Sequence, residues 1–439
     1  MKTIQRFSSV LFVILFTTIL LSCEKLHPSD PLDPFRKFSK ERDLIVVISD
    51  MHLGADLAYA ECKDNLPALE EFLTQIRESS NVKELVIAGD LLDEWFVPAP
   101  INTYQGKDQS DFVKRIAEAN KGVFGVLKRI IRERRILVTY VPGNHDLTIT
   151  EENVDLILPG INQKRDPELG LGTYSPEGYP KIVIEHGHRY NFFCSPDPYS
   201  NQDVAPGTIL PPGYFFTRIA AQYVSQGEPT VEVVIPPVTP NTSGDESQNL
   251  LFSYFKMWEW TLNMFTIEDK FNEDIIVTNI DKFTGTYSVN DILPYQETPG
   301  GFIDVNLYNG IQDNWVQRQE HNHVLVPIPA QQAIAGSALA SETDNQAAVQ
   351  YFLNPKSNVR IVVFGHSHVP TMISSFDHLQ QKSIYVNSGT WIDDNPKRTT
   401  MNFVVITPQK NDCCSKTHVR LYNFEDEVIT LMAEDSVRL

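Results

Sequence analysis

The sequence is short of cysteine, of basic residues and of long hydrophobic runs. It has five cysteines among 439 residues, and its formal net charge at pH 7 is −19. That charge argues against non-specific nucleic-acid binding, because such proteins neutralise phosphates with basic surface, so no nucleic-acid partner is expected. The chain has no internal repeat, low-complexity tract or run of like charge. With 42% hydrophobic residues it has an ordinary globular composition, long enough for two or three domain-sized units.

The N-terminal apolar stretch, residues 10–21, is too short for an ordinary membrane span. Lys2 and Arg6 precede it and "LLSC" closes it, which is the pattern of an export signal. The ending also resembles a bacterial lipoprotein signal, in which Cys23 becomes the lipidated first residue once residues 1–22 are removed. We therefore expect a protein that is exported and lipid-anchored to the bacterial cell envelope. A plain secretory signal or an uncleaved anchor is the alternative.

The remaining cysteines carry no catalytic or metal-binding signal. None lies near a base or at the spacing of metal ligands, and in a compartment that permits disulfides the four allow three pairings, which the sequence leaves open. They are Cys62, Cys194, Cys413 and Cys414.

Histidine is also scarce, with 11 residues, yet six of them fall at the ends of predicted strands. Five apolar, β-branched runs each end in carboxylate, carboxamide or imidazole groups. Helical patterns between the runs indicate parallel β-α-β units, in which the ligand site lies beyond the carboxyl ends of the strands. The five ends read "SDMH" (49–52), "GD" (89–90), "GNHD" (143–146), "HGH" (186–188) and "GHSH" (365–368).

This collection of donor groups predicts a site for two divalent cations. Asp50 and His52 are two residues apart, as are His366 and His368, so an alternating strand end turns both members of a pair to one side. Mixed imidazole and carboxylate ligands suit Mn, Fe or Zn better than Ca or Mg. Two hydrolytic metals, about 3.5–4 Å apart, need a bridging carboxylate. Asp90 is the natural candidate for that bridge.

In this order the five motifs resemble the calcineurin-like metallophosphoesterase family, over residues 43–190 and 358 to about 425. The resemblance implies an α/β fold, a four-layer αββα sandwich whose second sheet is completed by late strands such as "SIYVNSG", "NFVVIT" and "THVRLYNF". It implies that His145 is the acid facing the leaving group and that Asp146 orients it. The implied ligands are Asp50, His52, Asp90 and His368 for one metal, and Asp90, Asn144, His186 and His366 for the other.

The expected activity is binuclear metal-dependent phosphoester hydrolysis, in which a hydroxide bridging the metals attacks phosphorus and His145 protonates the departing oxygen. The stretches "GDLLDEW" and "YVNSGTW" are similar to the UDP-2,3-diacylglucosamine diphosphatase group. That group carries Arg in place of His145 and works on the cytoplasmic side, so the small phosphorylated substrate stays open, a nucleotide diphosphate being one option. Monoester, diester and diphosphate cleavage are alternatives, as is a non-catalytic surface lipoprotein that binds a ligand or partner. A nuclease of the same family is a third option, which the negative charge and the export signal disfavour. The oligomeric state is also left open.

Other residues near the strand ends have weaker patterns. His188 and Arg189 follow a predicted ligand and are candidates for contacting a phosphate oxygen, with a supporting or surface role as the alternative. Trp95 and Trp391 end two loops, where they either stack on a substrate ring or cover the sheet edge. The remaining assignments are a solvated or supporting role for Asp93 and Glu94, and a surface turn for His321 and His323.

About 165 residues separate "HGHRYN" from "NVRIVV", far more than one crossover needs, and predict a partly helical cap insertion. Helical patterns lie at 213–226, 247–268 and 331–352, and a long helix is predicted over 110–133. The predicted organisation is a signal peptide (1–22), a tether (23–42), a core in two parts (43–190 and 358–439) and a cap insertion (191–357) between them.

Overall fold

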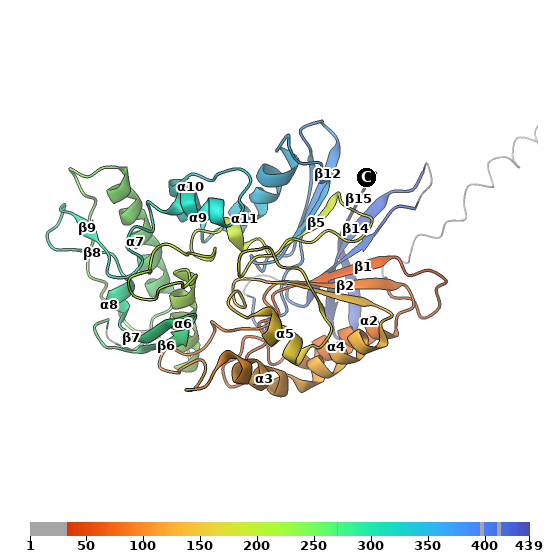
Figure 1. Ribbon diagram of the computed structural model, residues 1–439, viewed down its shortest axis with the longest axis horizontal. Coiled ribbons are helices and arrows are strands. Elements are labelled where there is room, and N and C mark those ends of the chain that lie inside the picture. Colours follow the sequence, from red (N-terminus) through yellow and green to blue (C-terminus); the bar gives the residue numbers. More distant parts are fainter. Residues whose placement is uncertain (1–32, 270, 396–398, 411–413) are drawn as a thin grey trace, which may run out of the picture.

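Two β-sheets packed face to face form the centre of the molecule (Figure 1). The computed structural model describes residues 33–269, 271–395, 399–410 and 414–439. The first sheet has the order β15-β14-β13-β1-β2-β3-β4, and the second has the order β11-β12-β10-β5. The strands of the first sheet are β1 Leu44–Ile48, β2 Val82–Ala88, β3 Leu137–Val141, β4 Asn162–Gln163, β13 Asn402–Thr407, β14 Thr417–Glu425 and β15 Val428–Val437. Those of the second are β5 Ile182–Ile184, β10 Ile361–Phe364, β11 Thr371–Phe376 and β12 Lys382–Asn387.

The strands that lead to the predicted site are buried on both faces. In β1, Ile45 and Val47 pack with residues of the second sheet such as Val363, while Val46 and Ile48 pack on the other side with the helices. This is the pattern expected of parallel strands covered on both sides. Strands β1, β2 and β3 are parallel, and so are β5, β10 and β12, so their carboxyl ends point the same way within each sheet.

Helices α2 Leu66–Glu78, α3 Gln109–Ala119, α4 Lys121–Glu133 and α5 Glu151–Ile157 form the layer outside the first sheet (Figure 1). The prediction of one continuous helix over 110–133 is wrong, because Asn120 interrupts it with φ −112° and ψ 34°. The Asn120 side chain donates to Gly54 O at 2.9 Å and to Ile116 O at 2.8 Å. A short amide that bonds to nearby backbone competes with the helix in this way.

Two of the late strands belong to a different sheet from the one predicted. "SIYVN" forms β12 of the second sheet as expected, but "NFVVIT" and "THVRLYNF" form β13 and β14 of the first sheet. Strand β13 pairs antiparallel with β1, with Val46 opposite Val405, and so covers the edge of β1 that β2 leaves open. An unpaired edge at the centre of a buried sheet would leave backbone groups without partners.

The fourth layer comes from the end of the insertion. Helix α11 Ala340–Gln346 continues into a π-helical segment, Ala347–Phe352, which lies against β11 and β12. The predicted αββα sandwich is therefore confirmed, with its second helical layer supplied by the insertion.

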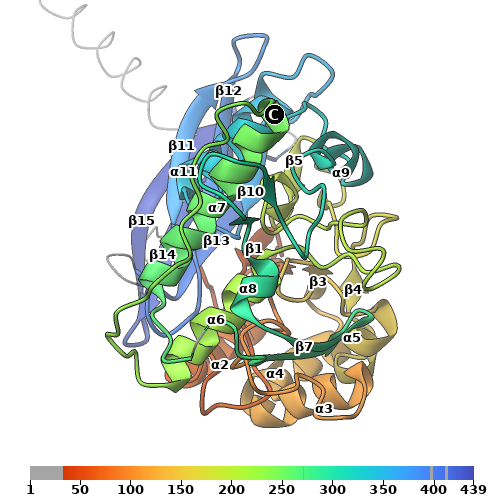
Figure 2. The same ribbon diagram turned by 90° about the vertical axis from the view of Figure 1, so that its left-hand side faces the viewer.

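The insertion also forms a separate lobe at the far end of the molecule from the start of β1, and Figure 2 views the molecule from that side. The predicted helices at 213–226 and 247–268 are confirmed as α6 Gly213–Ser225 and α7 Glu246–Met264. The pattern at 331–352 is broken into α10 Ala330–Gly336, α11 and the π-helical segment. The other elements are β6 Ile276–Ile280, β7 Phe283–Tyr287, α8 Val289–Ile292, β8 Tyr295–Gln296, β9 Ile303–Asp304 and α9 Trp315–His321.

The aromatic stretch of α7 is core. The ring of Trp258 is fully buried and stacks on Phe216 of α6 with 3.8 Å between ring centroids, whereas Trp260 on the opposite face is 47% exposed. None of the helices among the described residues combines the length and the apolar character needed to cross a membrane.

A buried arginine ties the insertion to the core. The guanidinium of Arg218 in α6 is fully buried and donates to carbonyl oxygens of the core loop after β2 and to Val277 O of β6. The acceptors in the core loop are Val97, Pro98, Ala99 and Ile101, at 2.6–3.1 Å. A buried guanidinium needs this many acceptors, and the acceptors in turn depend on it.

We expect Arg218→Ala to lower the free energy of unfolding by about 3 kcal/mol, because it leaves several buried carbonyl groups without donors. Chemical denaturation of the variant beside the parent protein measures this. Arg129→Ala, which removes an exposed arginine of α4, is the matched control and should change the stability by less than about 0.5 kcal/mol. Equal stability of both variants would show that Arg218 does not hold the insertion on the core.

Candidate metal centre

The structure brings all seven predicted ligands together beyond the carboxyl ends of five strands. Each follows its strand within four residues: β1 leads to Asp50 and His52, and β2 to Asp90. Strand β3 leads to Asn144, β5 to His186, and β10 to His366 and His368. Five of the seven residues are nearly or wholly buried, whereas His366 and His368 are half-buried, with 24% of the His368 side chain exposed.

The first donor group surrounds the Nε2 atom of His52. That atom lies 3.1 Å from His368 Nε2 and 3.6 Å from Asp90 Oδ2, and His368 Nε2 lies 3.2 Å from Asp50 Oδ1. These are the four residues predicted for one metal.

The second donor group surrounds the side-chain oxygen of Asn144. Asn144 Oδ1 lies 3.0 Å from His186 Nε2 and 2.8 Å from His366 Nδ1, and His186 Nε2 lies 3.1 Å from Asp90 Oδ2. The other nitrogen of His186 faces Ala88 O at 2.9 Å, which leaves Nε2 free to act as a ligand.

One oxygen, Asp90 Oδ2, therefore belongs to both donor groups. The other oxygen, Oδ1, accepts the backbone N–H of His145 at 2.8 Å, which fixes the orientation of the carboxylate. Donor atoms around Mn, Fe or Zn sit about 2 Å from the ion and hence about 3 Å from one another. The distances within both groups fit that requirement for two ions that share Asp90.

Electrostatics inside the cluster favour ionised carboxylates facing imidazoles. Burial opposes ionisation of Asp90, but the charges of His186 and other imidazoles outweigh it and hold the pKa of Asp90 well below its usual range. Burial together with the charge of His186 lowers the pKa of His366 to about 3, so the His366 ring is neutral and its lone pair is available to an ion.

The backbone at the cluster is unusual for residues that carry side chains. Five predicted ligands occupy the left-handed region, in which a non-glycine residue costs about 1 kcal/mol or more. Such residues cluster at functional sites, because the surrounding structure must hold them there. The five are Asp50 (φ 54°), His52 (φ 46°), Asp90 (φ 50°), His366 (φ 67°) and His368 (φ 57°).

The glycines of the motifs allow the ligand loops to approach one another. A Cβ atom on Gly143 would lie 2.1 Å from Asp90 Oδ1, and one on Gly365 would lie 2.5 Å from Asp50 Oδ2. Any side chain at either position would displace a carboxylate of the cluster.

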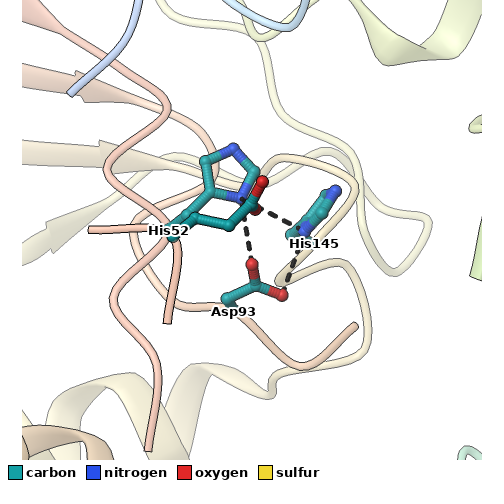
Figure 3. Close-up of side chains that lie close together, drawn as sticks. His52, Asp93 and His145 are labelled. Carbon is teal, nitrogen blue, oxygen red and sulfur yellow. Dashed lines mark hydrogen bonds and ion pairs between the residues drawn. The ribbon is translucent and has the colours of Figure 1, made fainter. Parts of the chain in front are cut away.

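A carboxylate beside the cluster, Asp93, joins two of its histidines (Figure 3). Asp93 Oδ2 lies 3.1 Å from His52 Nδ1, and Asp93 Oδ1 lies 3.0 Å from His145 Nδ1. Asp93 is buried, and its Oδ1 also accepts from the amides of Trp95 and Phe96. Burial opposes ionisation, but the His145 charge and the hydrogen bonds outweigh it and lower the pKa of Asp93. The prediction that Asp93 is a solvated or supporting residue is thus half right: it supports the cluster but is not solvated.

The predicted contact between Asp146 and His145 is wrong. The carboxylate of Asp146 is fully buried and accepts the backbone N–H groups of Gly143, Leu91 and Leu92 at 2.7–3.3 Å. It holds the loops that carry Asp90 and Asn144 together, while Asp93 orients the imidazole of His145. Burial and the charge of Asp90 raise the pKa of Asp146 to about 6.

Glu61 is a member of the cluster that sequence reasoning missed. Its Oε2 lies 3.2 Å from His52 Nδ1, so Glu61, Asp93 and His145 all face the side of His52 turned away from the first donor group. Burial raises the pKa of Glu61 above its usual value. Glu61 lies in an irregular loop after β1, and nothing in its local sequence marks it.

Arg189 and His188 do not reach the open side of the site. The guanidinium of Arg189 is buried, forms an ion pair with Glu185 at 2.7 Å and donates to Asp166 at 2.7 Å and to Asn322 O at 3.1 Å. Its predicted role in contacting phosphate is wrong, because its hydrogen-bonding capacity is already used. His188 is also buried, with Nε2 2.9 Å from Gly170 O, and its ring centroid lies 5.3 Å from that of His186.

The two loop tryptophans are core residues, and neither is open to a substrate. Trp95 and Trp391 are both fully buried, and the Trp95 ring lies 5.0 Å from the ring of His145.

His323 is a surface residue that pairs with Glu168, as predicted for a surface turn. Cys62 and Cys194 are both free thiols, and Cys23 and Cys413 lie outside the described residues.

Comparison with known proteins agrees with the geometry of the cluster. Residues 44–209 match the family described as Calcineurin-like phosphoesterase. They form a calcineurin-like phosphoesterase domain. The match includes the ligand positions from Asp50 to His186 and extends 19 residues into the predicted insertion, while His366 and His368 lie outside it.

No curated protein matches the chain. Among solved structures, a nuclease from Pseudomonas putida, nuclease MPE, is similar with 16% sequence identity and a TM-score of 0.20. The likeness covers 36% of this chain and about half, 55%, of that one. At this level it carries no argument about the substrate.

Asp93→Asn tests the carboxylate that joins His52 and His145. The amide offers a single acceptor oxygen to two imidazoles, so we expect affinity for divalent metal to fall about 10–100-fold, the usual effect of losing a partner of a ligating histidine. Metal titration followed by elemental analysis measures this.

Asp146→Asn is the matched control, since it alters a buried carboxylate that accepts hydrogen bonds from the backbone amides of Gly143, Leu91 and Leu92. We expect it to lower the melting temperature, and at a temperature where it is folded to retain more of its metal affinity than Asp93→Asn. Equal loss of metal in both variants would contradict the role given to Asp93.

Proposed function

We propose that the protein is a binuclear metal-dependent phosphoester hydrolase acting on a small phosphorylated substrate. The observation that carries this proposal is the position of Asp90 Oδ2, which is shared by two complete donor groups. Seven converging ligands, five of them in strained backbone conformations, are far more than a binding scaffold without catalysis would need. Two divalent ions held here would neutralise the phosphoryl oxygens and activate a water molecule for attack.

His145 has the position and charge expected of a general acid. It borders the first donor group, and 12% of its side chain is exposed. Asp93 holds Nδ1, so the opposite nitrogen, Nε2, is the one that can give a proton to a leaving oxygen. Burial disfavours the charged ring, but the Asp93 carboxylate outweighs it and raises the pKa of His145. A raised pKa favours the protonated ring, which is the form that a general acid requires.

The substrate enters the proposal only as a chemical class. The "GDLLDEW" and "YVNSGTW" stretches favour a nucleotide-diphosphate type of compound, while His145 in place of Arg distinguishes this chain from the diphosphatases that it resembles. Assays of phosphomonoesters, phosphodiesters and nucleotide diphosphates with Mn²⁺ discriminate among the three reaction types.

His145→Ala is the decisive variant for catalysis. General-acid help is worth about 10²–10⁴-fold, and only when the leaving group needs a proton. We expect this loss of kcat/KM on an alkyl phosphate ester and a much smaller loss on a nitrophenyl ester, whose leaving oxygen is already a stable anion. Steady-state kinetics on both esters, with metal content measured in parallel, test this.

Asp90→Asn provides the comparison, since it should lose metal and lose activity on both esters alike. If His145→Ala behaved as Asp90→Asn does, His145 would be a metal ligand or a packing residue and the assignment as general acid would be wrong.

We also propose that the chain is exported and anchored to the cell envelope by lipid on Cys23. The support is the "LLSC" ending of the N-terminal apolar stretch, which lies outside the described residues. Cys23→Ser should abolish labelling by a radioactive fatty acid and leave the unprocessed precursor, as seen by mass. Labelling that persists in the variant would rule this out, and Cys62→Ser, which alters a buried thiol, should leave labelling unchanged.

A further inference from the structure

A basic face lies at the end of the first sheet opposite the metal centre. It is formed by two segments, residues 36–42 before β1 and residues 128–135 at the end of α4 and before β3. Together they carry nine cations and two acids in a chain whose net charge is −19. The cations of the basic face are Arg36, Lys37, Lys40, Arg42, Lys128, Arg129, Arg132, Arg134 and Arg135.

The two segments meet in space beside the end of α2. Arg36 N donates to Asn81 Oδ1 at 3.0 Å, and Arg135 donates to Arg77 O at 3.2 Å. Burial and the charge of Arg135 lower the pKa of Arg42.

The two acids within these segments are themselves paired, and the other acids nearby, Asp33, Glu71, Glu78 and Glu427, border a hollow that Arg36 and Lys37 also line. Glu41 pairs with Lys410 at 2.6 Å, and Glu133 pairs with Arg77 at 2.6 Å and with Arg135. Each acid is thus matched by a cation from outside the two segments, and Lys37, Lys40, Lys128, Arg129 and Arg132 are all exposed.

Apolar groups stand among these cations. Phe38 is 96% exposed, directly between Lys37 and Ser39. On the other segment, Leu137 is 48% exposed and borders a hollow of about 900 Å³. The lining of the hollow combines cations and apolar side chains and includes no acid; it contains Lys128, Arg132, Arg134, Ile131, Leu156 and Pro159.

We infer that the basic face rests on an anionic phospholipid surface. Clustered lysine and arginine are attracted to anionic headgroups, and an exposed aromatic ring beside them is suited to the boundary between headgroups and acyl chains. The described chain begins at residue 33 on this same face, where Asn81 donates to Pro34 O and the Phe35 ring lies 5.9 Å from that of Phe72. The N-terminal segment, which carries the proposed lipid on Cys23, therefore joins the fold where the cations gather.

This contact would turn the metal centre away from the bilayer. Strands β1, β2 and β3 start at the basic face and end at the ligands, and the seven residues of β2 span about 20 Å. Figure 1 shows the lobe of the insertion at the end of the molecule away from the segment before β1. A substrate would then reach the proposed active site from the aqueous side, which favours a soluble phosphoester over a lipid of the same membrane. This last step rests on the proposed function, whereas the membrane contact does not.

Amide hydrogen exchange of the full chain reconstituted on vesicles tests the contact. We compare phosphatidylglycerol vesicles with phosphatidylcholine vesicles and follow residues 36–42. Because each cation near an anionic surface strengthens the attraction about fivefold, we expect these amides to exchange at least about fivefold more slowly on phosphatidylglycerol. Raising the salt to about 0.5 M should reduce the difference, since salt screens exposed charges.

Two triple variants make the test specific to this face. Lys128→Gln with Arg132→Gln and Arg134→Gln should abolish the protection. The matched control, Lys114→Gln with Lys256→Gln and Lys282→Gln, removes three exposed lysines of α3 and the insertion and should leave it unchanged. Neither set lies in the metal centre, so phosphoesterase activity on a soluble ester should survive in both, which separates this inference from the proposed function.

Three results would overturn the inference. Equal exchange of residues 36–42 on the two kinds of vesicle would show that the basic face does not bind anionic lipid and would favour an acidic macromolecule as its partner. Protection that appeared on α7 and not on residues 36–42 would place the insertion on the membrane. Equal loss of protection in both triple variants would show a response to net charge alone.

Discussion

The metal centre depends on how the carboxylate of Asp90 is held. One oxygen is fixed by the backbone N–H of His145, and the other is thereby directed between His52 and His186. The loops that meet around it are in turn joined by Asp146, whose carboxylate accepts backbone N–H groups from both loops. A single buried acid thus sets the spacing of two donor groups, and a second buried acid, with no role in binding metal, sets the position of the first.

The parts of the structure that could be predicted from sequence are those that repeat a simple rule. Apolar runs ending in acid, amide or imidazole place ligands at the carboxyl ends of parallel strands, and Asp50, Asp90, Asn144, His186 and His366 all obey it. Strand pairing obeys no such local rule. The runs that form β13 and β14 are equally suited to either sheet, and only the open edge of β1 decides between them.

Side-chain partners were harder to predict than positions. Asp146 adjoins His145 in sequence, yet its carboxylate turns toward backbone amides, and the partner of His145 comes from Asp93, 52 residues earlier. Glu61 contacts His52 from an irregular loop, so no strand or helix pattern in the sequence predicts its position. Arg189 follows a ligand histidine, but burial beside Glu185 requires an ion pair and removes the guanidinium from the site. In each case the outcome depends on which polar groups share a buried space, and sequence distance does not measure that.

The pairing of β1 with β13 has a consequence for how the chain reaches its folded state. Ile45 pairs with Ile406, which lies more than 350 positions later in the chain. The second edge of β1, the central strand of the first sheet, therefore stays uncovered until β13 is present. Contacts of such long range are slow to form, and an uncovered apolar strand is prone to aggregate in the meantime. His366 and His368 are also synthesised late. A chain that is still being synthesised therefore has an exposed sheet edge and lacks one ligand of each donor group. Folding and metal loading are therefore expected to be late, coupled events that require nearly the whole chain.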